Sequence, residues 1–78
     1  MKPIMQTLAS RIAALMVAQL KKDQPEGNML HFEEFARTAA ESIVDRAKST
    51  NTLTTLEINL MRVEYEQNLL NPISWANN

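Results

Sequence analysis

Acid–base or metal chemistry near neutral pH would have to involve His31, the only histidine in the chain. Its imidazole is the one side chain that changes charge between about pH 5 and 8 without help from its surroundings. Glu34 lies three residues further on, so the two would form a weak pair of metal ligands on one side of a helix. A zinc site takes about three or four converging ligands, and there is no second histidine and no cysteine. We expect a solvated histidine at the start of a helix, with no metal and no cofactor.

Nucleophilic catalysis and catalysis by paired carboxylates have equally little support. Gly27 is the only glycine, which excludes a glycine-rich loop that cradles phosphates. The adjacent Glu33 and Glu34 would point to different parts of a helix surface. No serine lies in a nucleophile-elbow motif; the serines are Ser10, Ser42, Ser49 and Ser74. We therefore predict that the protein is not an enzyme.

The elements that position these side chains are predicted to be three helices. Helix-forming residues dominate, no segment alternates with the period of a strand, and Pro3, Pro25, Gly27 and Pro72 mark the breaks. The pattern predicts helices over 3–22, 29–48 and 55–70, followed by a short C-terminal tail. With 78 residues there is room for one core. We expect a compact all-α three-helix bundle that forms a single domain over 1–78.

The net charge of −1 conceals an uneven distribution along the chain. Residues 1–22 hold four basic residues and no acid, whereas residues 23–78 hold four basic and nine acidic residues. This polarity favours a cationic first helix that packs against two anionic ones. The basic start also resembles a targeting segment, but its longest apolar run, 12–18, is far shorter than the ~18 residues of a membrane span. We expect a cytoplasmic protein without a membrane span.

Two helix starts carry capping signals. Asn28 is positioned to cap the second helix, directly after the loop that contains Pro25 and Gly27. Thr54 and Glu57 have the spacing of a capping box, which predicts Thr54 as the N-cap of the third helix. Leu53 and Ile58 lie at the two positions of the accompanying hydrophobic staple.

The second helix is predicted to be amphipathic. Its apolar face is predicted to consist of Phe32, Phe35, Ala36, Ala39, Ile43 and Ala47. A charged face on the other side consists of Glu34, Arg37, Glu41, Asp45 and Lys48. Ion pairs four residues apart on such a face contribute only about 0.2 to 0.5 kcal/mol each. We interpret this charged face as a solvated surface rather than as a binding site.

The third helix differs from the second because it has two apolar faces. Leu56, Leu60, Val63 and Leu70 recur on one side, and a second group recurs on the opposite side. Two short helices cover one of these faces and leave the other for the tail, a second copy or another protein. The predicted protein-binding surface is the second group together with the tail tryptophan: Ile58, Met61, Tyr65, Leu69 and Trp75.

These observations favour a non-enzymatic protein–protein interaction module that acts as a small regulator, adaptor or stoichiometric inhibitor, as phage- or plasmid-type accessory proteins do. We expect a homodimer or higher homo-oligomer, because a domain this small without disulfides is marginally stable alone. The alternative is a small DNA-binding transcription regulator, although Glu57, Glu64 and Glu66 would oppose phosphate. A third possibility is membrane-surface binding by the broad apolar arc of the first helix.

Overall fold

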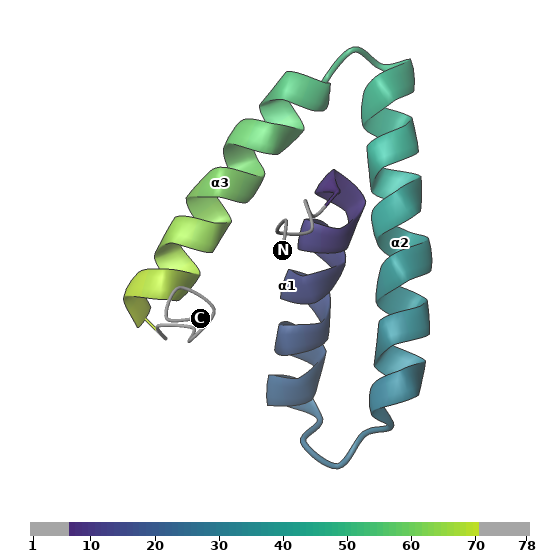
Figure 1. Ribbon diagram of the computed structural model, residues 1–78, viewed down its shortest axis with the longest axis vertical. Helices are drawn as coiled ribbons and strands as arrows, with labels where there is room; N and C mark the ends of the chain where they lie inside the picture. Colours follow the sequence, from purple (N-terminus) through teal and green to yellow (C-terminus); the bar gives the residue numbers. More distant parts are fainter. Residues whose placement is uncertain (1–6, 71–78) are drawn as a thin grey trace, which may run out of the picture.

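A computed structural model of the chain describes residues 7–70, which form three α-helices and no strand. Helix α1 spans Leu8–Asp23, α2 spans Met29–Ser49 and α3 spans Leu53–Leu70 (Figure 1). Helices α1 and α2 run antiparallel side by side, and α3 meets α2 at one end and diverges from it toward the other. The predicted all-α three-helix fold is confirmed. Within residues 7–70, no helix is long and apolar enough to span a membrane.

Helix α1 begins five residues later than predicted, at Leu8 rather than Pro3. Thr7 adopts an extended conformation, with φ −70° and ψ 162°, and its hydroxyl accepts a hydrogen bond from the amide of Ser10 at 3.0 Å. This is the geometry of an N-cap, which ends the helix on its N-terminal side. The sequence interpretation overlooked Thr7 because the apolar pattern continues upstream of it, through residues that lie outside the described range.

The loop between α1 and α2 follows the prediction closely. The Oδ1 atom of Asn28 accepts hydrogen bonds from the amides of Leu30 at 2.9 Å and His31 at 3.3 Å, so Asn28 is confirmed as the N-cap of α2. Gly27 packs under the ring of Phe32, where a Cβ atom would lie only 2.0 Å from the ring carbon Cζ. The loop therefore needs glycine for a close approach rather than for an unusual backbone angle.

The connection between α2 and α3 is a Schellman motif. Asn51 takes the left-handed conformation with φ 57°. The amide of Thr52 donates to the carbonyl of Ala47 at 2.8 Å, and the amide of Asn51 donates to the carbonyl of Lys48 at 3.4 Å. Asparagine is the residue after glycine that best tolerates this conformation. Helix α2 is thus terminated by its own backbone, and α3 begins two residues after Asn51.

The predicted capping box at Thr54 is wrong. Helix α3 begins at Leu53, and the amide of Leu56 already donates to the carbonyl of Thr52 at 2.9 Å. Thr54 is therefore an exposed residue of the first helical turn. Leu53 packs against the core while Ile58 is exposed on another side of α3, so the predicted hydrophobic staple is absent as well. The Schellman turn brings the chain into the helix earlier than the capping pattern indicated.

Replacing Thr7 by Ala should lower the free energy of unfolding by about 1 kcal/mol, because one amide of the first turn loses its acceptor. The matched control is Thr54→Ala, which should change stability by less than about 0.5 kcal/mol because Thr54 caps no helix. Urea denaturation of both variants measures the difference. Equal losses, or a larger loss at Thr54, would contradict this assignment of the helix starts.

The core is narrow and lies between all three helices. Its central residues are Ile12 of α1, Ala40 and Val44 of α2, and Leu60 of α3. Around them pack partly buried residues from α1 and α3: Leu8, Ala9, Ala13, Leu15, Met16, Leu53 and Leu56. Helices α1 and α2 make most of the contacts between elements, and α3 adds fewer. The first two helices therefore form the base on which α3 rests.

The buried face of α2 is rotated from the predicted one. Phe32, Ala36 and Ala47 are buried as expected, but Phe35 and Ile43 are 59% and 40% exposed. Ala40 and Val44 take their places in the core, so the buried residues follow a four-residue repeat from Phe32 to Val44. Small side chains at Ala36 and Ala40 allow α1 to approach closely, and that approach determines which side of α2 is covered.

Candidate protein-interaction surface

The outer side of α3 presents a row of large apolar side chains to solvent. Ile58 is 53% exposed, Met61 is 61% exposed and Tyr65 is 65% exposed. Because α-helical residues three and four apart are neighbours on the surface, these three form one continuous strip. We call Ile58, Met61 and Tyr65 the outer α3 face. No other residue of the described chain, 7–70, covers it to the extent that a core requires.

The opposite side of α3 packs against the rest of the bundle. Leu60 is buried, and Leu53 and Leu56 are partly buried against the core. Because the buried and exposed residues lie on opposite sides, docking of α3 onto the core necessarily turns the outer α3 face toward solvent. Of the residues predicted for the core side, Val63 remains 42% exposed, since α3 diverges from α2 toward its C-terminal end (Figure 1).

An ion pair between α1 and α3 adds to this packing. The guanidinium of Arg11 on α1 donates from Nε to Oε2 of Glu64 at 3.0 Å and from Nη2 to Oε1 of the same carboxylate. This two-point contact is directional, and the hydrogen bond to Glu64 raises the pKa of Arg11 further above its ordinary value. The pair is an instance of the predicted packing of a cationic first helix against an anionic one. It joins α1 to α3 in the orientation in which Tyr65 is exposed.

The structure does not test every residue of the predicted surface. Leu69 lies within α3, but its side chain is outside the described set, and Trp75 lies beyond residue 70. The expected contact of Trp75 with this face therefore stays a prediction. Ile58, Met61 and Tyr65 are brought together on one face of α3, as the spacing predicted.

Other parts of the described chain offer less for chemistry. His31 is exposed at the start of α2, and within residues 7–70 no three His, Asp or Glu side chains converge as metal ligands would. On α2, sequence reasoning missed four exposed apolar residues: it assigned Phe35 and Ile43 to the core, and it gave Met29 and Leu30 no role. Comparison of the chain with protein-family models, curated proteins and solved structures finds no match.

Proposed function

We propose that the protein is a non-enzymatic protein–protein interaction module, a small cytoplasmic regulator, adaptor or stoichiometric inhibitor. It binds a protein partner through the outer α3 face and also self-associates. The observation that carries the proposal is the exposure of Ile58, Met61 and Tyr65 in one strip of α3. Anchors at positions i, i+3 and i+7 of a helix are the pattern by which amphipathic helices dock into apolar grooves.

The chemistry of the outer α3 face suits a protein groove. Tyrosine buries a large rigid ring while keeping its hydroxyl able to form a hydrogen bond, which makes it frequent among residues that dominate binding energy. Methionine adapts its shape to irregular surfaces. A partner with an apolar groove lined by a few hydrogen-bond acceptors would therefore match this face.

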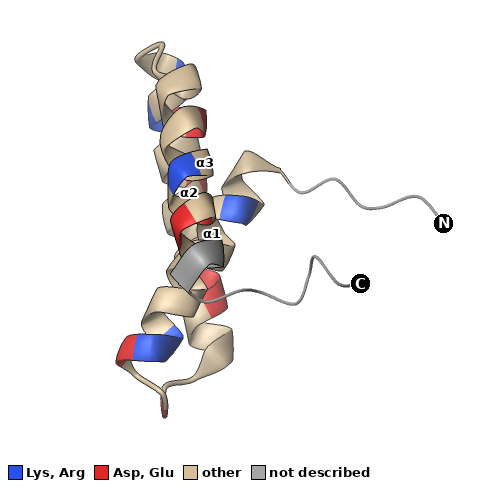
Figure 2. Cartoon of the chain, turned by 90° about the vertical axis from the view of Figure 1, so that its left-hand side faces the viewer, with Lys and Arg blue, Asp and Glu red and all other residues tan. Residues whose placement is uncertain are grey.

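The two alternatives find less support. In a DNA complex α3 would be the reading helix, yet it presents Glu57 and Glu66, and its Glu64 is engaged with Arg11. On the side shown in Figure 2, basic and acidic residues are interspersed rather than gathered in a basic patch. Membrane binding by α1 would need its apolar arc, but the large side chains of that arc, among them Ile12, Leu15 and Met16, pack into the bundle.

Affinity capture from the native cells tests the proposal. The wild-type chain should retain a protein at a stoichiometric ratio, and Met61→Asp should lose that protein because the substitution puts a charge into the centre of the apolar contact. The matched control is Val63→Ala, which alters an exposed apolar residue of α3 outside the outer α3 face. Capture that is unchanged by Met61→Asp, or abolished equally by Val63→Ala, would overturn the assignment of this face.

A further inference from the structure

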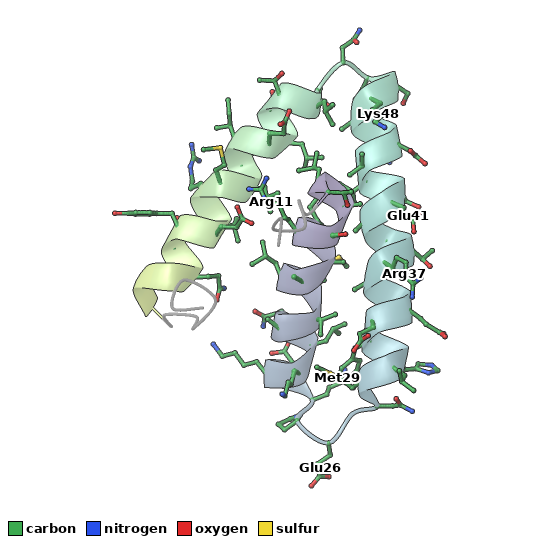
Figure 3. The ribbon with its side chains drawn as sticks, in the orientation of Figure 1. Arg11, Glu26, Met29, Arg37, Glu41 and Lys48 are labelled. Atoms are coloured by element: carbon green, nitrogen blue, oxygen red, sulfur yellow. The ribbon has the colours of Figure 1, made fainter. Side chains whose placement is uncertain are left out.

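A second surface lies away from the outer α3 face, in the groove between α1 and α2. It has a volume of about 960 Å³ and extends to the start of α3. Small apolar residues of α1 form one side of it, among them Ala13, Ala14 and Val17. Arg37, Glu41, Asp45 and Lys48 of α2 line the other side. We call this the α1–α2 groove; Figure 3 shows Arg37, Glu41 and Lys48 along α2.

Five charges on the face of α2 beside this groove are arranged symmetrically about Glu41, whereas Glu33 of α2 and Glu57 of α3, which also line the groove, lie outside this symmetry. Arg37 and Asp45 lie four residues before and after it, and Glu34 and Lys48 lie seven residues before and after it. Each pair joins one base with one acid. At about 100° per residue, all five lie within an arc of about 80° on α2. We call Glu34, Arg37, Glu41, Asp45 and Lys48 the charge stripe; it is the face of α2 that the sequence interpretation assigned to solvent.

Such an arrangement is complementary to itself when two copies of α2 run antiparallel. A twofold axis through Glu41 places Arg37 against Asp45 of the partner subunit. The same axis places Glu34 against Lys48 of the partner subunit. Each contact occurs twice because a twofold interface uses one surface on both chains. Within the charge stripe, four oppositely charged contacts then outweigh the single like-charged one, between Glu41 and Glu41 of the partner subunit.

The charges of this stripe are available for such contacts. All five residues are exposed, and among residues 7–70 the only ion pair is Arg11 with Glu64, which lies elsewhere.

The size of the face formed by α1 and α2 fits a small dimer interface. The 21 residues of α2 extend about 31 Å, and a face two helices wide has a projected area on the order of 600 Å². This area is below the ~800 Å² that each partner buries in a standard-size complex, so the dimer is expected to be weak.

We propose that the α1–α2 groove is the site of self-association, where a second copy of this chain packs antiparallel with its α2 against α2 and the twofold axis at Glu41. The small apolar residues on the α1 side of the groove supply contact area. The charge stripe determines which residues of the two α2 helices lie opposite each other. This assigns the self-association proposed above to a surface separate from the outer α3 face, so each can fail without the other.

Sedimentation equilibrium of the full chain at low ionic strength tests the register. Arg37→Asp and Asp45→Arg each put like charges together at both symmetry-related contacts, so each should weaken self-association by about tenfold. An equimolar mixture of the two variants should regain wild-type affinity, because every such contact in the mixed dimer again joins a base with an acid. The double variant carrying both substitutions should also associate like the wild type.

The matched control is Glu26→Lys, a charge reversal in the α1–α2 loop, which should leave the dissociation constant unchanged. Tyr65→Ala should also leave it unchanged, because Tyr65 belongs to the outer α3 face. Circular dichroism confirms that each variant remains helical. A wild-type chain that stays monomeric at roughly 100 μM, single variants that associate normally, or a mixture no tighter than its components would each overturn the proposal.

Discussion

Replacing Leu60 by Ala should lower the free energy of unfolding by about 3 kcal/mol, the middle of the range for a buried leucine. Leu60 is only 4% exposed and, among the described side chains of α3, is the one in the centre of the core, together with Ile12, Ala40 and Val44. The substitution removes its packing and leaves a cavity in a core that has few other large side chains. A loss of this size is a large fraction of the stability of a small domain.

The loss should be concentrated in α3. Helices α1 and α2 contact each other extensively, whereas α3 is attached through Leu60, its neighbours Leu53 and Leu56, and the Arg11–Glu64 pair. Hydrogen exchange of Leu60→Ala should therefore show faster exchange of α3 amides than of α1 and α2 amides. Met61→Ala is the control, since Met61 is 61% exposed. A similar small loss in both variants would show that α3 does not depend on this contact.

The number of helices and the loop between α1 and α2 were predictable because their signals are local, whereas the start of α1 was placed five residues too early. Proline, glycine and the Asn28 cap end or start helices through their own backbone and side-chain chemistry. The start of α3 was not predictable from Thr54 and Glu57, because a Schellman turn centred on Asn51 depends on a residue other than glycine adopting a left-handed conformation. Sequence patterns seldom indicate a left-handed conformation at a residue other than glycine.

Which faces are buried was predictable only in part. In α3 the two apolar faces lie on opposite sides, so packing one of them against the core exposes the other. Leu60 is buried and Tyr65 is exposed, as predicted. In α2 the apolar residues spread over a wide arc, and the contact with α1 decides which of them are covered. Phe35 is exposed for that reason. The α1–α2 groove could not be predicted from either helix alone, because it exists only where the two lie side by side.

Replacing Tyr65 by Ala should have the largest effect on binding. Aromatic anchors near the centre of an interface commonly contribute 2 kcal/mol or more, so we expect affinity for the captured partner to fall about 30-fold. Stability should change by less than about 0.5 kcal/mol, because the side chain is 65% exposed and makes few contacts to lose. Trp75→Ala, predicted from the sequence to act with Tyr65, should weaken partner binding in the same way.

Titration of the partner with Tyr65→Ala and wild-type protein, combined with urea unfolding of the same two samples, tests the central claim most directly. If the outer α3 face binds the partner, the dissociation constant rises about 30-fold while the free energy of unfolding stays nearly constant. If that face is instead the seat of the chain's own tail, the reverse is observed: Tyr65→Ala loses stability and binds the partner as tightly as the wild type.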